Sequence, residues 1–210
     1  MYFQYGDRET RFLKSRDPSL GEAIDRIGHI HREVDSDLFP SVIRHIIGQQ
    51  ISTKAQATIW QRLIDKVGNV CVDGICADAV CSDAICALAI EEIQGLGMTF
   101  RKAEYIKDFA LRVKNNEFDL DGLVGLPDGE VVKKLTALKG IGVWTAEMIM
   151  IFGLKRPDVV SYGDLGIRRG MGMLYRHETI DKKRFMQYRE RYSPYGSVAS
   201  LYLWAIAGGG

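Results

Sequence analysis

The sequence predicts an all-α protein, a two-lobed helical bundle with a central cleft. Apolar residues recur at helical spacing through most of the chain, and no segment shows convincing strand alternation. The links between the helical segments are short. With 210 residues, 46% of them hydrophobic and 26% charged, the chain can form one large domain or two small lobes around a core.

The first part of the chain predicts helices on either side of a short loop. Apolar residues follow helical spacing before residue 48 and again after residue 52. The loop ends in Ser52, a residue type favoured at helix N-termini. The pattern resumes later, until Gly95 and Gly97 interrupt it. The residues at helical spacing are Val42, Ile43, Ile46, Ile47, Ala55, Ile59, Leu63, Val67, Ile85, Ala89 and Ile93.

The second part of the chain predicts further helices. Residues 101–113 suit one helix, and Pro127 followed by an acidic first turn marks the start of the next. A glycine hairpin then leads into a helix over residues 143–152. Helices over residues 182–192 and 198–207 complete the chain.

These elements suggest three segments. We expect residues 1–36 to form an N-terminal segment that packs on the helical core, with residues 1–5 as a remnant of a strand. Residues 37–204 form the main domain, in which a pair of helices joined by the hairpin spans about residues 128–152. Residues 205–210 are a C-terminal tail.

The net charge does not by itself indicate nucleic-acid binding, because 28 Lys and Arg residues face 27 Asp and Glu residues. Basic residues do gather around the hairpin, where they form either a solvated surface or a local site for phosphate. No run of about 18 apolar residues predicts a membrane span, and no signal peptide is recognisable. We therefore expect an intracellular protein. The gathered residues are Lys133, Lys134, Lys139, Lys155, Arg156, Arg168, Arg169 and Arg176.

The four cysteines follow one another at intervals of five residues. On a helix this spacing turns neighbouring side chains by about 140°, so they cannot share a face. It also differs from the usual spacings of zinc and iron–sulfur ligands. We expect free thiols that serve as small apolar residues at Cys71, Cys76, Cys81 and Cys86.

Gly140 and Gly142 bracket Ile141 in the hairpin, and Ile141 is expected to point inward. The helix that starts near Val143 presents N–H groups without intrahelical partners, which suit a phosphate oxygen. Thr145 can add a hydroxyl donor. On spacing alone the hairpin is equally a helix–helix corner, but the nearby lysines favour phosphate binding, which holds DNA without reading its sequence.

Asp164 follows Gly163 and precedes a helical segment, so it is a good candidate for a helix N-cap. A carboxylate at a helix start that faces a cleft can also stabilise an oxocarbenium-like sugar or activate water. The two interpretations are compatible.

The hairpin Leu138-Lys139-Gly140-Ile141-Gly142-Val143-Trp144-Thr145-Ala146, followed by Gly163-Asp164-Leu165-Gly166-Ile167-Arg168, resembles the helix-hairpin-helix DNA glycosylase superfamily. More narrowly, the chain resembles the bacterial 3-methyladenine DNA glycosylase II family. The loop Gly48-Gln49-Gln50-Ile51-Ser52 and the last helix, Ser197 to Trp204, match this family as well. The resemblance covers roughly residues 37–204 and implies an all-α, base-flipping enzyme of the HhH-GPD type. It also implies a cytoplasmic, nucleoid-associated protein of bacterial origin.

The resemblance implies roles for several residues. Asp164 matches the catalytic aspartate, and Trp144 stands where bifunctional relatives carry a lysine nucleophile, so a monofunctional enzyme that leaves an abasic site is expected. Trp144 and Trp204 match the aromatic residues of the base pocket, although on the sequence alone both suit a helix core. Met148 replaces an aromatic residue found in some relatives, so the substrate preference can differ.

DNA contacts are expected from both loops. Gln50 matches the residue that fills the gap left by the flipped nucleotide, and without the resemblance it is simply a polar loop residue. The expected DNA-binding residues are Gly140, Gly142, Thr145, Lys139, Gln50, Gln49, Ser52 and Arg168.

No cofactor is expected to be required. Hairpins of this superfamily often hold a cation through main-chain carbonyls, which makes Leu138 and Ile141 candidates for such a structural site. No cysteine follows Cys86, so the C-terminal iron–sulfur cluster of some relatives is not expected. Too little chain precedes residue 37 for the β-rich lobe of the longer members.

The leading hypothesis is hydrolysis of the N-glycosidic bond of alkylated purines in duplex DNA by a monomeric enzyme. An alkylated purine is already cationic and leaves without strong acid catalysis, which suits a site with one carboxylate. Two alternatives remain open: a glycosylase for oxidised bases such as 8-oxoguanine, and a helix-hairpin-helix DNA-binding module without catalysis.

Overall fold

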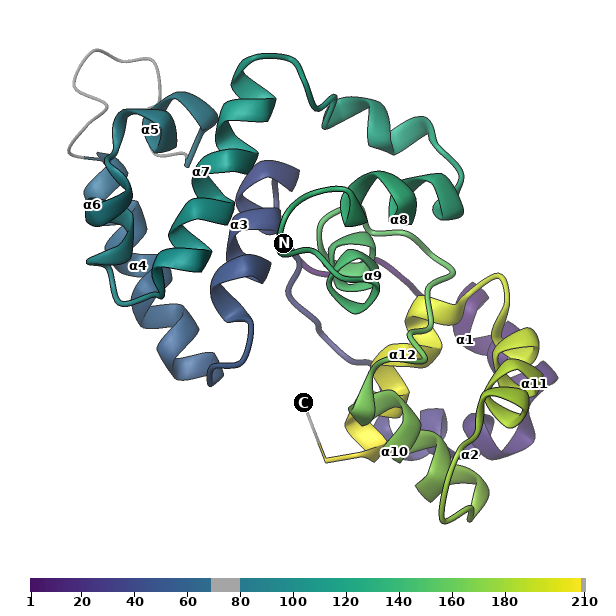
Figure 1. The fold of residues 1–210 in the computed structure, drawn as a ribbon. Coiled ribbons are helices and arrows are strands. Elements are labelled where there is room, and N and C mark those ends of the chain that lie inside the picture. The colour runs from purple at the N-terminus through teal and green to yellow at the C-terminus, as the bar shows by residue number, and fades with distance from the viewer. Residues whose placement is uncertain (69–79, 209–210) are drawn as a thin grey trace. The chain divides into compact units, whose positions relative to one another are not determined.

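The computed structural model describes residues 1–68 and 80–208. In this part of the chain the secondary structure is helical (Figure 1), which confirms the predicted all-α class. The strand remnant expected at residues 1–5 amounts to one antiparallel bridge between Tyr2 and Glu33. None of the described helices is long and apolar enough to cross a membrane.

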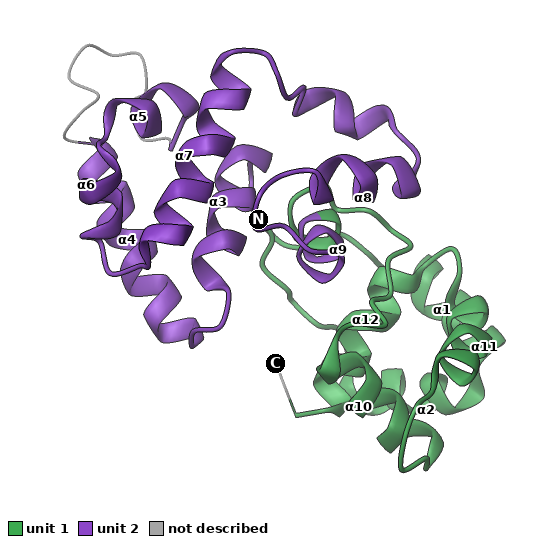
Figure 2. Ribbon diagram, viewed as in Figure 1, with its two compact units in different colours: residues 1–34, 150–210 green, residues 35–149 purple. Residues whose placement is uncertain are grey.

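The helices divide into two compact units (Figure 2), which we call unit 1 and unit 2. Unit 1 combines residues 1–34 with residues 150–210, and unit 2 consists of residues 35–149. Unit 1 contains α1 (Asp7–Arg16), α2 (Pro18–Ile27), α10 (Leu165–Tyr175), α11 (Lys182–Tyr192) and α12 (Gly196–Ile206). Unit 2 contains α3 (Leu38–Gly48), α4 (Thr53–Gly68), α5 (Ser82–Ala87), α6 (Ile90–Gln94), α7 (Phe100–Lys114), the 3₁₀ helix η1 (Asp121–Gly125), α8 (Asp128–Thr136) and most of α9 (Val143–Phe152).

In unit 1, α10 and α12 pack against each other at very short range. A Cβ atom added to Gly170 of α10 would lie 2.1 Å from the carbonyl oxygen of Leu203 on α12. Because this neighbour is backbone, it cannot move aside without shifting the helix, so the contact requires glycine. Close packing at this point fixes α10 against the helix that carries Trp204.

Buried Asp17 joins α2, α10 and α11 within unit 1. Its Oδ1 caps α2 by accepting from the N–H of Leu20 at 3.0 Å. Its Oδ2 accepts from the hydroxyl of Tyr175 at 2.9 Å and from Arg191 at 3.0 Å. The hydrogen bond to Asp17 raises the pKa of Arg191, and burial raises the pKa of Tyr175. Both oxygens of a carboxyl group that is only 1% exposed thereby have hydrogen-bond partners.

The core of unit 2 confirms the predicted helical spacing in α3 and α4, whereas Ala89 is exposed in the extended link between α5 and α6. Val42, Ile43, Ile46 and Ile47 of α3 are buried, and so are Ile59, Leu63 and Val67 of α4. Lys102 of α7 donates to the carbonyls of Ile47 and Gln49, so it satisfies the C-terminal end of α3. The loop after α3 is thereby anchored to α7.

The prediction of free thiols is wrong for Cys81, which is disulfide-bonded, whereas Cys86 is free. A continuous helix would turn neighbouring cysteines away from each other, but the backbone at Cys81 is extended, with φ −117° and ψ 167°. Cys71 and Cys76 lie outside the described residues.

Candidate functional site

The predicted hairpin joins α8 and α9 in unit 2. Gly140 has φ +82°, and a Cβ atom added there would lie 2.2 Å from the ring of Tyr105 on α7. Glycine is therefore needed both for the backbone angle and for space. Ile141 is 5% exposed and anchors the turn as predicted. A Cβ atom on Gly142 would meet nothing within 4 Å, so this side of the turn is open.

Gln49 connects the loop after α3 to the hairpin. Its Nε2 donates to the carbonyl of Gly140 at 2.7 Å and to Oγ1 of Thr145 at 3.4 Å. Thr145 is only 5% exposed, so its hydroxyl takes part in this internal contact. Lys139 forms an ion pair with Asp108 of α7 at 2.7 Å. A phosphate bound here would therefore have to share the Lys139 ammonium with Asp108.

The same loop exposes Gln50. This residue adopts the left-handed conformation, with φ +57°, which costs a residue other than glycine roughly 1–2 kcal/mol. Ser52 starts α4 as predicted, because its Oγ accepts from the N–H of Ala55 at 3.2 Å. The loop is thus held on both sides of Gln50, by Gln49 and by Ser52.

Asp164 of unit 1 is the N-cap of α10, as the sequence predicts. Its Oδ1 accepts from the N–H of Ile167 at 2.8 Å and from the indole N–H of Trp204 at 3.0 Å. The residue is 8% exposed. The positive end of the α10 dipole stabilises negative charge at this point.

Trp204 is held by more than its bond to Asp164. Its ring stacks on Phe152, with centroids 5.8 Å apart and an interplanar angle of 24°, and the guanidinium of Arg32 lies 5.0 Å from the Phe152 centroid. A Cβ atom on Gly166 would lie 2.9 Å from Cδ1 of Trp204 and 3.1 Å from Oδ1 of Asp164. Gly166 therefore lets the first turn of α10 approach the indole.

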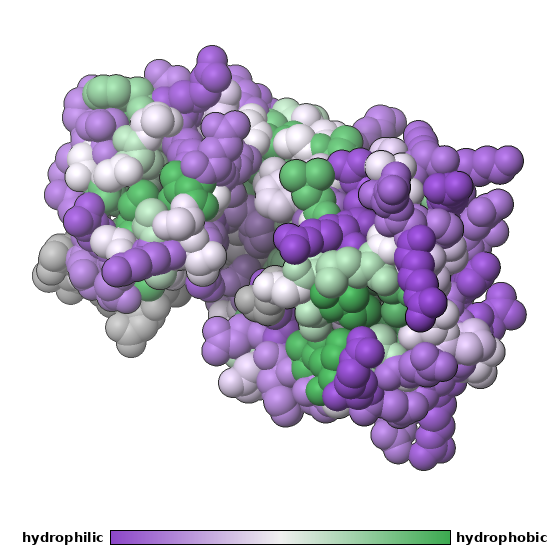
Figure 3. Space-filling model, turned by 90° about the horizontal axis from the view of Figure 1, so that it is seen from below, coloured by the Kyte–Doolittle hydropathy of each residue, from purple (hydrophilic) through white to green (hydrophobic). Residues whose placement is uncertain are grey.

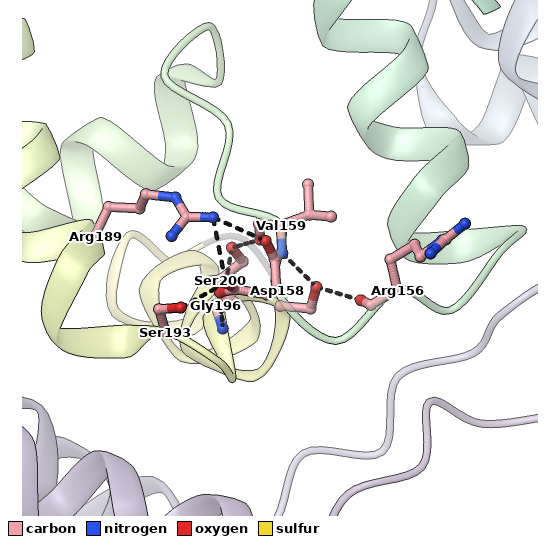
Figure 4. A network of polar contacts seen from close by, with 8 residues as sticks. Arg156, Asp158, Val159, Arg189, Ser193, Gly196 and Ser200 are labelled. Atoms are coloured by element: carbon pink, nitrogen blue, oxygen red, sulfur yellow. Dashed lines mark hydrogen bonds and ion pairs between the residues drawn. The ribbon is translucent and has the colours of Figure 1, made fainter. Parts of the chain in front are cut away.

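The start of α12 is fixed by Asp158 (Figure 4). Asp158 Oδ1 accepts from the N–H of Gly196 at 3.0 Å, and Oδ2 accepts from Ser193 at 2.7 Å and from Arg189 at 3.4 Å. Ser200 donates to the carbonyl of Val159 at 2.9 Å. This network ties the chain before α10 to the start of α12, so it supports the two elements that bring Asp164 and Trp204 together.

The sequence pattern of HhH-GPD superfamily base excision DNA repair proteins matches residues 43–194. The chain belongs to this superfamily. The helix-hairpin-helix at α8 and α9 and the aspartate at the start of α10 are therefore parts of an HhH-GPD domain, and the resemblance predicted from the sequence is confirmed.

This HhH-GPD chain is similar to enzymes that act on alkylated DNA. The DNA-3-methyladenine glycosylase of Saccharomyces cerevisiae is 32% identical over 201 residues, which cover 81% of this chain and 67% of that protein. The chain spans 59% of the length of a Bacillus subtilis relative. A crystal structure of a DNA-3-methyladenine glycosidase from Bacillus halodurans has a TM-score of 0.85 at 34% identity, with 99% of this chain and 93% of that chain covered. A Schizosaccharomyces pombe 3-methyladenine DNA glycosylase in complex with abasic DNA has a TM-score of 0.78 at 25% identity, with 94% and 95% covered.

The other predicted pocket residues lie in α9. Trp144 is 43% exposed and Met148 is 4% exposed, and both belong to unit 2, whereas Asp164 and Trp204 belong to unit 1. The base pocket that these residues would form together stays a prediction.

Apolar patches among hydrophilic residues are visible on one face of the molecule (Figure 3).

Arg168 has a different environment from that expected of a phosphate ligand. Its guanidinium lies 5.1 Å from the ring centroid of Tyr162, and its buried Nε has no hydrogen-bond partner within the described residues. Arg168 thus contributes first to packing in unit 1, and its role in DNA binding stays a prediction.

Sequence reasoning missed Gly166, Phe152 and Asp158. Gly166 stands two residues after Asp164 in the motif Gly163 to Arg168, and a glycine so close to the carboxylate is a local signal of close packing there. The roles of Phe152 and Asp158 depend on contacts with α12, and no local pattern indicates them. Sequence reasoning also gave no indication that Gln49 bonds to the hairpin.

Among residues 1–68 and 80–208, no group of three or more His, Cys, Asp or Glu side chains is placed to hold a metal ion. A cation at the hairpin would use carbonyl oxygens instead. The carbonyl of Leu138 accepts from the N–H of Ile141 at 3.2 Å. A carbonyl oxygen has two lone pairs, so this bond leaves Leu138 able to act as a ligand.

Proposed function

We propose that the chain is a monofunctional DNA glycosylase that hydrolyses the N-glycosidic bond of alkylated purines of the 3-methyladenine type. The damaged base is flipped from duplex DNA, and an abasic site remains. The observation that carries this proposal is the placement of Asp164, whose carboxylate is held at a helix N-terminus by Ile167 and by the indole of Trp204. The names of the similar enzymes support the same substrate class.

The carboxylate of Asp164 supplies the electrostatic part of the reaction. As the glycosidic bond breaks, positive charge develops on the sugar, and a fixed carboxylate stabilises this oxocarbenium-like state or orients the attacking water. The N–H of Ile167 and the indole N–H of Trp204 hold Oδ1 of this carboxylate in place. Trp144 occupies the position of the lysine nucleophile in bifunctional relatives and carries no amine, so a Schiff base does not form.

The aromatic residues supply recognition. An indole ring attracts a cationic alkylated base more strongly than a neutral one, because the ring face carries negative charge. Trp204 lies beside the carboxylate, and Trp144 is exposed on α9. Both are proposed to contact the flipped base together with Met148.

The hairpin is proposed to hold the DNA backbone. The first N–H groups of α9 and the open side of Gly142 can receive a phosphate, and a cation bound by the carbonyls of Leu138 and Ile141 would add positive charge. Gln50, exposed in its left-handed conformation, is proposed to enter the space of the flipped nucleotide. The related enzyme in complex with abasic DNA supports DNA as the partner. We propose that the enzyme acts as a monomer.

The test is release of 3-methyladenine from methylated duplex DNA by the wild-type protein and by Asp164→Asn. Release by the wild type alone, with both proteins equally folded, supports the proposal. Release of an oxidised base instead would assign the enzyme to oxidative damage. Salt-sensitive DNA binding without release of any base would indicate a binding module.

A further inference from the structure

Unit 1 contains a pocket of about 730 Å³ that is separate from the residues around Asp164. It is lined by α2, by the C-terminal turns of α10 and α12, and by two side chains of α11. Its volume lies in the range of small-molecule sites. Asp164 and Trp204 do not line it, so the proposed reaction leaves this pocket without a role.

The lining of the pocket is cationic. The lining contains three arginines, Arg26, Arg176 and Arg191, and one acidic residue, Glu22. Unit 1 as a whole contains 16 Lys and Arg residues against 11 Asp and Glu residues, whereas unit 2 contains 12 against 16. The near-zero net charge of the chain thus conceals a basic unit, and an anion is the ligand that complements it.

One wall of the pocket is already ordered. Arg191 is held by Asp17 at 3.0 Å and lies 5.0 Å from the ring centroid of Tyr188. Tyr188 stacks on Tyr175 with centroids 3.7 Å apart and an interplanar angle of 2°, and its hydroxyl contacts Nε2 of His177 at 2.7 Å. A guanidinium has five N–H donors, so the bond to Asp17 leaves several for a ligand.

Each of the three arginines lies in or just after the last turn of its helix, where the helix dipole favours a cation. This explains why arginine is tolerated at each position, but not why arginines from three helices line one pocket. Arg176 also adopts the left-handed conformation, with φ +58°, at a C-cap where glycine would avoid strain. Within residues 1–68 and 80–208, the side chains of Arg26 and Arg176 form no ion pair and no hydrogen bond.

We propose that this pocket binds a phosphate ester, with the phosphate held by Arg26 and Arg176 and the organic part beside Tyr175 and Tyr188. The forked guanidinium matches phosphate oxygens in pairs, which makes arginine suited to this ligand. The phosphate can belong to a free nucleotide or to a DNA backbone. The DNA case rests on the proposed function.

The experiment compares a pocket variant with a matched control. Arg26→Gln/Arg176→Gln removes two charges from the pocket, and Arg8→Gln/Arg16→Gln removes two exposed charges from α1 of the same unit. Thymidine monophosphate is titrated against each protein by calorimetry, and binding to an undamaged duplex is measured as a function of salt. Thermal unfolding shows that each variant is folded.

For a nucleotide site, the Kd for thymidine monophosphate rises at least about tenfold in the pocket variant and by less than about twofold in the control. For a DNA site, the slope of log K against log salt falls in magnitude by about 0.9 in the pocket variant only, since the two arginines hold one phosphate and each lost phosphate contact removes about 0.9. A pocket variant that behaves like the control with both probes overturns the proposal.

A measurement on the wild-type protein guards against misfolding of the variant. Addition of thymidine monophosphate should shift the NMR amide signals of Ala205 and Ile206, which line the pocket, and not those of α1. The inference is also refuted if these signals do not shift and the pocket variant binds DNA with the same salt dependence as the wild type. Base release by the wild type is measured separately, so failure of the proposed function is distinguished from failure of the pocket.

Discussion

Replacement of Gly166 by alanine should slow base release while the protein stays folded. The added Cβ atom would lie 2.9 Å from Cδ1 of Trp204, whereas ordinary contact begins at 3.4 Å. The indole must therefore retreat by about 0.5 Å, or Asp164 must move instead. The retreat is resisted because the ring stacks on Phe152 and bonds to Asp164. A misplacement of about 1 Å can cost about a hundredfold in rate, so a loss of roughly tenfold or more is expected in the single-turnover rate.

The stability of this variant should change little. Alanine in place of glycine within a helix gains roughly 0.5–1 kcal/mol, and this gain offsets part of the steric cost at Trp204. Gly129→Ala on α8 is the matched control, because a Cβ atom there would meet nothing within 4 Å.

Single-turnover release of 3-methyladenine measures the chemical step for both variants, and circular dichroism measures their Tm. Gly166→Ala should release the base more slowly than the wild type, and Gly129→Ala should release it at the wild-type rate. If Gly166→Ala keeps its rate within about twofold of the wild type, the position of Trp204 does not control the reaction as argued.

Three further predictions concern stability and DNA binding. Gly170→Ala should destabilise unit 1 by about 1–3 kcal/mol and lower the Tm by roughly 2–4 °C per kcal/mol, because the new Cβ atom collides with the Leu203 backbone; calorimetry would detect this. Gln49→Leu should raise KM for damaged DNA several-fold without a comparable loss of kcat, since the hairpin loses its tie to the loop; an equal fall in kcat would contradict a role in positioning. Although desolvation by burial opposes it, the hydrogen bond from Lys139 keeps the pKa of Asp108 below its ordinary value of 3.8. The stability that Asp108 contributes is therefore present above that value and lost as pH falls through the folded pKa, so acid titrations of wild type and Asp108→Asn should converge at low pH.

The parts of the fold and site that could be predicted are those with local causes. Apolar residues at helical spacing, such as Ile43, Ile47 and Leu63, lie in the core because one helix face must be buried. Gly140 needs a positive φ, and Asp164 caps the helix that follows it. In each case the signal and its consequence lie within a few residues of each other.

Other parts depend on residues that are distant in sequence. Trp204 could be proposed for the base pocket by resemblance, but its bond to Asp164 joins residues 40 positions apart. The sequence predicts that Lys139 binds phosphate, yet its ammonium pairs with Asp108, 31 positions earlier. The grouping of residues 1–34 with residues 150–210 is equally invisible in local patterns. Such pairings follow from how the helices pack, which helical periodicity does not determine.

The interrupted course of unit 1 has a consequence for the order of folding. Unit 2 is one continuous stretch, residues 35–149, and it can form its core while the rest of the chain is still on the ribosome. Unit 1 contains α1 and α2, which are synthesised before unit 2, and α12, which is synthesised after it. Until α12 is released, α1 and α2 lack their partner, and Asp164 lacks the indole that holds it. The newly made protein therefore has the hairpin before Asp164 is held in place, and removal of α12 would release Asp164 before it disturbs unit 2.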